Sequence, residues 1–300
     1  MKNSVRLPAF AKVNLCLHVL GRRPDGYHEL RTIFQAIGLR DTLELTRSKQ
    51  PGIKLEVNDP SLSPGPDNLV YRAIEAMGGE LGFRGGIRAR LIKKIPVARG
   101  LGGGSSDAAA ALIGMLRLTG NERTFALPKL MEIASRLGAD VPFFLFGGRA
   151  LAVNRGDEIY PLEDGPPRTI VVVSPRGIGV STKEAYEWLS SELTNRANLP
   201  TIWRFCALCW SRQGEVSNDF EGPVFRRHPR LGEIRDALLR VGAAEAALAG
   251  SGSAVFGVFR NPAQARRAAR NFPEDSVFAV ETLSREKYGR AMGWSAMAGR

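Results

Sequence analysis

The sequence has no apolar run long enough to cross a lipid bilayer, so we expect no transmembrane helix. Its most apolar window, residues 241–259, is interrupted by Glu245 and by the turn-forming residues Gly250–Ser253. Residues 1–8 also lack the apolar core of a secretory signal peptide. These absences predict a cytoplasmic protein that makes no contact with membranes.

Cysteine is scarce, with three residues in the 300 of the chain. Cys206 and Cys209 have C-x-x-C spacing, but no second cysteine pair or histidine pair stands at a zinc-ligand distance from them. No βαβ pattern surrounds them that would indicate a redox site. Because Trp203 and Trp210 flank the pair, we interpret it as part of an apolar helix face.

Acidic residues are outnumbered, 30 against 42 lysines and arginines, which gives a formal net charge of +12. The basic residues are scattered, and their densest groups are the doublets Arg22-Arg23, Arg226-Arg227 and Arg266-Arg267. No basic motif interleaved with aromatic residues, as in RNA-binding modules, is present. The charge therefore favours small anionic substrates over nucleic acid, although a basic nucleic-acid-binding protein stays as the alternative from another functional class.

The most informative segment is the glycine-rich run at residues 96–107, Pro-Val-Ala-Arg-Gly-Leu-Gly-Gly-Gly-Ser-Ser-Asp. Glycines let backbone N–H groups converge where side chains would obstruct them. The alanine-rich residues 108–112 continue as a helix, with Ser105 or Ser106 expected as its N-cap. A helix N-terminus facing such a loop binds phosphate well. The segment predicts a phosphate-binding loop and a nucleotide-dependent enzyme.

Two common phosphate-binding motifs do not describe this loop. No lysine follows the glycines before the serines, as a Walker A motif requires. The glycine spacing also differs from the dinucleotide-binding fingerprint, and the loop lies far from the first strand. Its position between the strand-like residues 87–91 and a good helix favours phosphate binding over a plain surface turn. The lysine of such a site must come from elsewhere in the chain.

The remaining pattern predicts an α+β protein of two domains, without internal repeats. In residues 12–19 apolar and polar side chains alternate, which indicates a strand with Lys12 and Asn14 on one face. The second domain is expected to hold an antiparallel sheet, and residues 285–300 are expected to form a loosely held basic tail. We expect further strands at 27–39, 43–45, 169–174, 254–259 and 277–280, and helices at 69–81, 128–137 (ended by Gly138), 182–189, 231–241 and 263–270.

Five separated segments together resemble the GHMP kinases: Ala-Lys-Val-Asn-Leu at 11–15, Pro-Asp-Gly-Tyr-His at 24–28, the glycine-rich loop, Leu-Gly-Ala-Asp-Val-Pro at 137–142 and Leu-Ala-Gly-Ser-Gly-Ser at 248–253. The resemblance runs from about residue 6 to residue 280. It implies a ribosomal-protein-S5-domain-2-like N-terminal domain for ATP binding and catalysis (1–158). A ferredoxin-like α/β-sandwich C-terminal domain (159–300) would bind the substrate.

The first, second and fourth segments are most similar to the branch of this family that phosphorylates the 2-hydroxyl of a cytidine-diphosphate-linked methylerythritol in the non-mevalonate isoprenoid pathway. The resemblance implies that Asp140 is the catalytic base and that Lys12 lies beside it. A nearby ammonium keeps a carboxylate ionised and favours developing alkoxide charge. Taken alone, Lys12 would more often be a solvated strand lysine, and Asp140 would equally well be a helix cap ahead of Pro142. Their joint occurrence in matching motifs favours the catalytic roles instead. A kinase for another alcohol, such as homoserine or mevalonate, stays as the runner-up.

The same resemblance assigns the binding residues. Tyr27 would stack on the cytosine, His28 would hydrogen-bond it, Tyr186 would cover its other face, and Asn14 would lie near the reacting hydroxyl. Gly250, Ser251 and Gly252 would lie near the phosphates, with a plain turn as the alternative, and Lys94 is the alternative to Lys93. Mg²⁺ would bridge the β- and γ-phosphates of ATP with Ser106 as its protein contact. The ATP-binding residues would be Asn68, Lys93, Pro96, Gly100, Leu101, Gly102, Gly103, Gly104, Ser105, Ser106 and Asp107.

Overall fold

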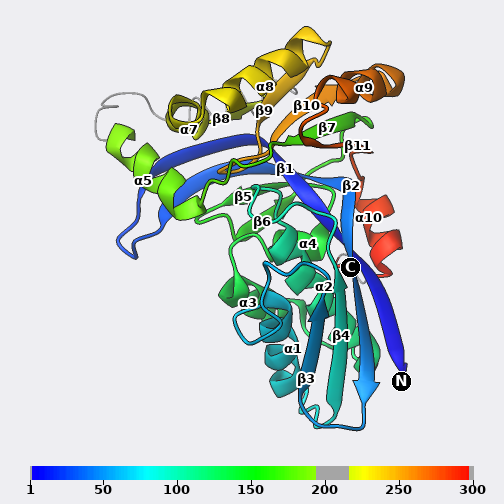
Figure 1. The fold of residues 1–300 in the computed structure, drawn as a ribbon. Coiled ribbons are helices and arrows are strands. Elements are labelled where there is room, and N and C mark those ends of the chain that lie inside the picture. Colours follow the sequence, from blue (N-terminus) through cyan, green and yellow to red (C-terminus); the bar gives the residue numbers. More distant parts are fainter. Residues whose placement is uncertain (1, 194–215, 297–300) are drawn as a thin grey trace.

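The computed structural model describes residues 2–193 and 216–296 as two β-sheets with helices packed on them (Figure 1). Its strands are β1 (Ser4–Arg22), β2 (His28–Ser48), β3 (Ile53–Val57), β4 (Gly86–Ile92), β5 (Arg149–Val153), β6 (Glu158–Pro161), β7 (Thr169–Ser174), β8 (Ser217–Asn218), β9 (Glu245–Leu248), β10 (Val255–Phe259) and β11 (Ser276–Glu281). Its helices are α1 (Leu69–Glu80), α2 (Gly103–Thr119), α3 (Leu127–Leu137), α4 (Phe143–Phe146), α5 (Thr182–Leu193), α7 (Glu221–Arg227), α8 (Pro229–Arg240), α9 (Pro262–Ala268) and α10 (Arg285–Met292), with a 3₁₀ turn at Ala269–Asn271.

The first sheet is built around a long antiparallel hairpin of β1 and β2 (Figure 1). It has seven strands, in the order β3-β4-β2-β1-β8, and β5 and β6 branch from β2. Strand β2 is continuous through Asp41, where two separate strands were expected. The Asp41 carboxylate is buried and accepts hydrogen bonds from the backbone N–H groups of Lys94 and Ile95, at 2.5 and 2.8 Å.

The strand expected at residues 12–19 is present within β1, but both of its faces are covered. Lys12, Asn14 and His18 are therefore buried, which excludes the solvated strand lysine that Lys12 taken alone would suggest. Strand β1 packs between the core of the first sheet and apolar residues of the second sheet. A lysine buried in this position needs polar partners, which the cleft described below supplies.

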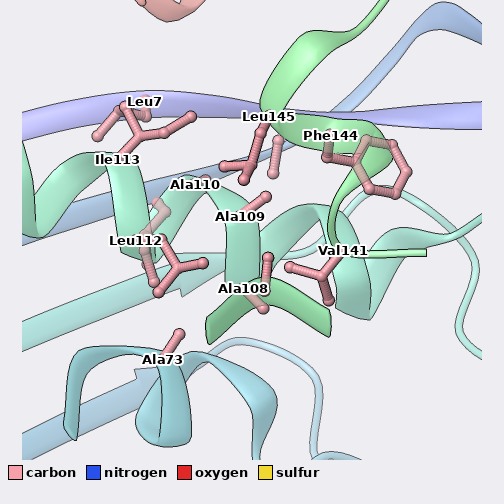
Figure 2. Packing of buried hydrophobic residues seen from close by; sticks show 14 of the residues in the cluster. Leu7, Ala73, Ala108, Ala109, Ala110, Leu112, Ile113, Val141, Phe144 and Leu145 are labelled. Atoms are coloured by element: carbon pink, nitrogen blue, oxygen red, sulfur yellow. The ribbon is translucent and has the colours of Figure 1, made fainter. Parts of the chain in front are cut away.

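Helix α2 lies at the centre of the first unit, against the sheet and against α1, α3 and α4 (Figure 2). Ala108, Ala109 and Ala110 are fully buried, and small side chains allow neighbouring elements to approach closely. The expected N-cap at Ser105 or Ser106 is wrong, because the cap is Gly102, at φ +71°. Glycine adopts this left-handed conformation without strain, so the helix begins inside the glycine run and exposes its first N–H groups there.

The second sheet is antiparallel, in the order β11-β7-β10-β9, as the sequence predicted. Its β7 strand alternates between two cores because successive side chains point to opposite faces. Val171 and Val173 pack with the helices α8 and α9 on one face, whereas Ile170 and Val172 pack toward β1 and β2 on the other. The second sheet therefore sits directly on the strand that carries Lys12.

The expectation of a loose tail after residue 285 is wrong for residues 285–292, which form helix α10. Tyr288 and Met292 are each 1% exposed and join the core of the first unit. Tyr288 donates a hydrogen bond to the carbonyl of Phe144 at 2.6 Å and packs against Phe10. The charged composition of these residues suggested a loose tail. A surface helix can nevertheless dock on the core through only two apolar side chains one turn apart.

Strands β6 and β8 also belong to the first sheet, although they lie on either side of β7 in the chain. The domain boundary at residues 158/159 stays a prediction. The C-x-x-C pair and its flanking tryptophans lie outside the described residues. Within residues 2–193 and 216–296, no helix is both long and apolar enough to span a membrane.

Candidate active site

A cleft of about 1220 Å³ opens between the two units. It brings together most of the residues singled out in the sequence: Lys12, Asn14, Tyr27, His28, Asn68, Lys93, Pro96, Gly100, Leu101, Gly102, Gly103, Gly104, Ser105, Asp107, Asp140, Tyr186, Gly250 and Ser251. Ser106 and Gly252 are absent from this lining, as is Lys94. The lining therefore joins the glycine-rich loop to the aromatic residues within one cavity.

Lys12 and Asp140 form an ion pair in the cleft, with 3.4 Å between Nζ and Oδ2. The lysine side chain is 5% exposed and the aspartate side chain 31%, so the carboxylate faces the open cavity while the ammonium lies behind it. Asp140 follows α3 in a tight turn, in which the N–H of Val141 donates to the carbonyl of Gly138. The turn presents a carboxylate to a substrate with a fixed cation at its back.

A chain of hydrogen bonds fixes Lys12 in place. Its Nζ donates to Oδ1 of Asn14 at 2.7 Å, and Nδ2 of Asn14 donates to Oγ1 of Thr32 at 2.8 Å. Thr32 in turn donates to the carbonyl of Cys16 at 2.6 Å. The ammonium also lies 5.0 Å from the centroid of the Phe34 ring. Asn14 and Lys12 thus share one face, as the strand period predicted.

The glycine-rich loop is packed so closely that three of its glycines leave no room for side chains. A Cβ on Gly100 would lie 1.8 Å from the carbonyl oxygen of Ala249, and one on Gly102 would lie 2.8 Å from the Phe144 ring. A Cβ on Gly103 would lie 3.1 Å from Ile95. The open backbone at the N-terminus of the 17-residue helix α2 forms a cradle suited to an anion such as phosphate.

Lys93 lines the cleft, but its ammonium is held inward. Its Nζ donates to Asp41 at 2.5 Å and to Asp107 at 2.7 Å. Burial lowers the pKa of Lys93, but the two carboxylates outweigh it and raise that pKa overall. Burial and the neighbouring Asp41 raise the pKa of Asp107 to about 7, against the effect of Lys93. Lys93, Asp41 and Asp107 form a buried triad. Its ion pairs link the end of β4 to the start of α2 and support the cradle.

Two buried oxygens at the first turn of α2 have no hydrogen-bond partner among the described residues. They are Oγ of Ser106 and Oδ1 of Asp107. Buried polar atoms without partners are uncommon and often mark a ligand or ion site. Both polar groups of the Asn68 side chain, by contrast, have partners. Its Oδ1 caps α1 by accepting from the N–H of Val70, and its Nδ2 donates to the carbonyl of Ser63.

The opposite end of the cleft is aromatic. His28 and Tyr186 stack with ring centroids 4.5 Å apart and an interplanar angle of 20°, and Nε2 of His28 lies 2.8 Å from Oγ of Ser190. Burial and then the charge of Arg22 lower the pKa of His28, which keeps its imidazole neutral near pH 7. Tyr27 is 55% exposed, with the guanidinium of Arg155 5.2 Å from its ring centroid. Tyr186 thus lies against His28, and Tyr27 stays open to a ligand.

Comparison with known proteins decides the family. A model described as the GHMP kinases N terminal domain matches residues 68–148, and one described as GHMP kinases C terminal matches residues 205–276. A 4-diphosphocytidyl-2-C-methyl-D-erythritol kinase of Solibacter usitatus is 45% identical over 298 residues, 97% of this chain and 92% of that protein. The chain belongs to the GHMP kinase family.

Other comparisons agree with this placement of the GHMP kinase. A protein of Geobacter metallireducens with the same name is 42% identical over 93% of the chain and 99% of its own length. A crystal structure of 4-(cytidine 5'-diphospho)-2C-methyl-D-erythritol kinase matches with a TM-score of 0.76 and 38% identity, covering 93% of this chain and 99% of that one. Homoserine kinase from Cytophaga hutchinsonii, with a TM-score of 0.68 and 19% identity, shares the fold. The expected two-domain GHMP kinase fold is confirmed, and the chain is an ATP-dependent phosphotransferase.

Several residues of the kinase cleft carried no recognisable signal in the sequence. Thr32 lies within strand β2 and Arg155 in the turn between β5 and β6, and neither residue belongs to a motif singled out in the sequence. Thr182 and Ser190 are spaced two turns apart on α5, so they fall on the same side of the helix as Tyr186. This spacing around Tyr186 is the one signal that could have pointed to Ser190.

Proposed function

We propose that this GHMP kinase transfers the γ-phosphoryl group of ATP to the 2-hydroxyl of 4-diphosphocytidyl-2-C-methyl-D-erythritol, a step in non-mevalonate isoprenoid precursor biosynthesis. The observation that carries the proposal is the position of the Lys12–Asp140 pair, in a cleft with a glycine cradle at one end and aromatic residues at the other. A kinase needs such a base where its two substrates meet. The similar proteins that bear this name support the choice of acceptor.

Asp140 would accept the proton of the 2-hydroxyl as the oxygen attacks the γ-phosphorus. The Lys12 ammonium, 3.4 Å away, favours the ionised carboxylate and the negative charge that develops on the attacking oxygen. Asn14 holds that ammonium at 2.7 Å and lies near the reacting hydroxyl. Transfer is direct and in line, with ADP as the leaving group and no covalent enzyme intermediate.

The aromatic end would hold the cytidine. Tyr27 presents an exposed ring that can stack on the base, and His28 offers a neutral imidazole for a hydrogen bond. Tyr186, stacked on His28, would line the base site, and burial and then the nearby Asp140 charge raise its phenol pKa, which keeps the phenol neutral. A neutral phenol does not repel the diphosphate of the substrate.

The glycine cradle would hold the phosphates of ATP, and the first turn of α2 fits an accompanying Mg²⁺. Ser106 has a hydroxyl oxygen without a partner among the described residues, and oxygen is the donor that Mg²⁺ prefers. Bound Mg²⁺ would neutralise charge on the β- and γ-phosphates. Gly250 and Ser251 would close the cradle from the second unit.

The test is release of ADP from Mg-ATP by the purified protein with three acceptors: the cytidine-diphosphate-linked methylerythritol, homoserine and mevalonate. Turnover with the cytidylated compound alone is the expected result. Turnover with another alcohol instead would keep the phosphate chemistry and overturn the roles of Tyr27, His28 and Tyr186. Absence of turnover together with salt-dependent RNA binding would favour the nucleic-acid-binding alternative.

A further inference from the structure

The loop at residues 249–253 of the second unit, here called the glycine turn, packs directly on the phosphate cradle. The N–H of Ala254 donates to the carbonyl of Arg99 at 3.3 Å. A Cβ on Gly250 would lie 3.0 Å from the carbonyl oxygen of Gly100 and 3.3 Å from Nζ of Lys12. A small shift of this turn would therefore change the geometry around the lysine and the cradle together.

Asn218 holds the glycine turn from the side away from the cradle. The residue is 8% exposed, and its Nδ2 donates to the carbonyl of Leu248 at 2.8 Å and to the carbonyl of Gly250 at 2.7 Å. Both N–H donors of the Asn218 amide thus bind carbonyls, one just before the turn and one within it.

The acceptor side of the same amide serves a different element. Oδ1 of Asn218 accepts from the backbone N–H of Phe220 at 2.9 Å. The Phe220 ring lies edge-on to Tyr186, with centroids 4.8 Å apart at 90°. The donor half of Asn218 therefore faces the phosphate end of the cleft, and the acceptor half faces the aromatic end.

The position of Asn218 is set by β1, the strand that carries Lys12. It lies in β8, which pairs with β1 in parallel, Cys16 opposite Ser217 and Leu17 opposite Asn218. The N–H of Asp219 adds a hydrogen bond to the carbonyl of Leu17 at 3.0 Å. Strand β1 thus fixes both Lys12, within its own length, and the glycine turn, through Asn218.

We infer that Asn218 is a positioning residue for phosphoryl transfer, which holds the Gly250–Ser251 backbone at a fixed place beside Lys12 and the cradle. The inference rests on the proposed function only in assuming that the γ-phosphoryl group reacts at Lys12 and Asp140. Asn218 itself does not line the cleft, so its effect would act through the glycine turn. Its contribution belongs to the geometry of the transfer step, where a misplacement of about 1 Å can cost on the order of 10²-fold in rate.

Asn218→Asp separates the two halves of the amide. The introduced carboxyl group keeps the acceptor for Phe220 but at neutral pH loses both donors and sets a negative oxygen against two carbonyl oxygens. We expect kcat to fall roughly 10- to 100-fold. The KM for the acceptor alcohol should stay within about twofold, because the Phe220–Tyr186 contact is retained.

Acidification gives a second readout that loss of folded protein would not produce. Burial and the two carbonyls raise the pKa of the introduced carboxyl group, and its protonated form regains one donor. The ratio of variant to wild-type kcat should therefore rise from pH 8 to pH 6. Glu221, which accepts from the N–H of Leu248, and the His18–Asp219 pair lie nearby in both proteins, so the ratio removes their effect.

The matched control is Asn261→Asp. Asn261 caps α9 and only accepts, from the N–H groups of Ala263 and Gln264, so a carboxylate replaces it without loss. Wild-type kcat and a flat pH ratio are expected for this variant. If Asn218→Asp does not fold, Asn218→Ala tests the same point, because it removes the donors without the repulsion: the loss of kcat should persist, with no gain on acidification.

A folded Asn218→Asp or Asn218→Ala variant with kcat within twofold of wild type would overturn the inference. So would a rise in KM at constant kcat, which would place the role of Asn218 with the acceptor alcohol. All rates are compared with whichever alcohol the wild-type kinase phosphorylates. A failure of the proposed substrate and a failure of this inference are therefore distinguishable.

Discussion

The backbone N–H of Lys12 donates a hydrogen bond to the carbonyl of Leu101 at 3.0 Å. The strand that carries Lys12 and the glycine-rich loop are thus joined through their main chains, independently of side chains. Because Asn14 and Asp140 orient the other end of the same residue, both the backbone and the ammonium of Lys12 are fixed. Preorganised charge of this kind stabilises a transition state at little reorganisation cost.

Replacement of Asp140 tests the base. Asp140→Asn should lower kcat by about 10²- to 10⁴-fold, because the amide cannot accept the hydroxyl proton. The side chain is 31% exposed, so circular dichroism should show an unchanged fold. Asp236→Asn, on the surface of α8, is the matched control and should keep full activity. Full activity of a folded Asp140→Asn variant in the ADP-release assay would remove the aspartate from the mechanism.

Replacement of Lys12 tests the cation. Lys12→Ala should abolish most turnover, because Asp140 loses the ammonium that offsets developing charge. Lys54→Ala removes an exposed lysine that pairs with Glu56 and should leave kcat unchanged. Both variants are compared by initial rates and by thermal unfolding. Retention of wild-type kcat in folded Lys12→Ala would contradict the assignment.

Replacement of Tyr27 tests cytosine stacking. Stacking of a base on an aromatic ring contributes about 1–3 kcal/mol, so Tyr27→Ala should raise the KM for the cytidylated substrate by roughly 5- to 150-fold. The KM for ATP should change little, because Tyr27 lies at the other end of the cleft. Tyr160→Ala, at a comparably exposed tyrosine outside the cleft lining, is the control. Equal effects on the two substrates would argue against stacking.

The pH dependence of stability tests the buried triad. Since burial raises the pKa of Asp107 from 3.8 to about 7, the folded state binds this proton more tightly than the unfolded state. Stability from this group is present at low pH and is lost as the pH rises between those two values. Without nucleotide, the wild-type Tm should therefore decline from pH 5 to pH 8 more steeply than that of Asp107→Asn. Parallel curves for the two proteins would show that Asp107 titrates normally.

The docking of α10 gives a prediction on stability. Tyr288→Phe removes the hydroxyl that bonds the buried carbonyl of Phe144, which should cost about 1–3 kcal/mol in urea unfolding. Tyr160→Phe loses only an exposed bond to Glu158 and should be near neutral. Equal stability of the two variants would mean that the Tyr288 hydroxyl does not stabilise the docking of α10.

Much of the fold follows from local pattern, and the exceptions have physical causes. Strand β7 lies at the expected residues because its apolar run is uninterrupted. The predictions failed at Asp41, at Ser105 and Ser106, and in α10. At Asp41 and in α10 a distant contact overrides the local sequence: the buried Asp41 carboxylate accepts from backbone N–H groups of residues 94 and 95, and Tyr288 hydrogen-bonds to α4. At Ser105 and Ser106 the cause is local, because the left-handed Gly102 begins the helix earlier.

The candidate site was predictable to the extent that its residues sit in motifs. Lys12, Asp140 and the glycines were found in this way, and the structure places them in one cleft. The inward hydrogen bonds of the Lys93 ammonium were not predicted, because its partner Asp41 lies 52 residues away in the chain. Asn218 carried no signal either, since its role depends on pairing with a strand 200 residues earlier. Such contacts exist only once the chain has folded.

The packing of α10 has a consequence for synthesis of the chain. The core of the first unit contains residues from Val5 to Met292, so it is incomplete until Met292 has left the ribosome. The first unit therefore cannot complete its folding during translation before the second unit has been synthesised. The nascent first unit exposes the apolar surface that Tyr288 later covers. This interval is when a chaperone would engage the chain and when aggregation would compete with folding.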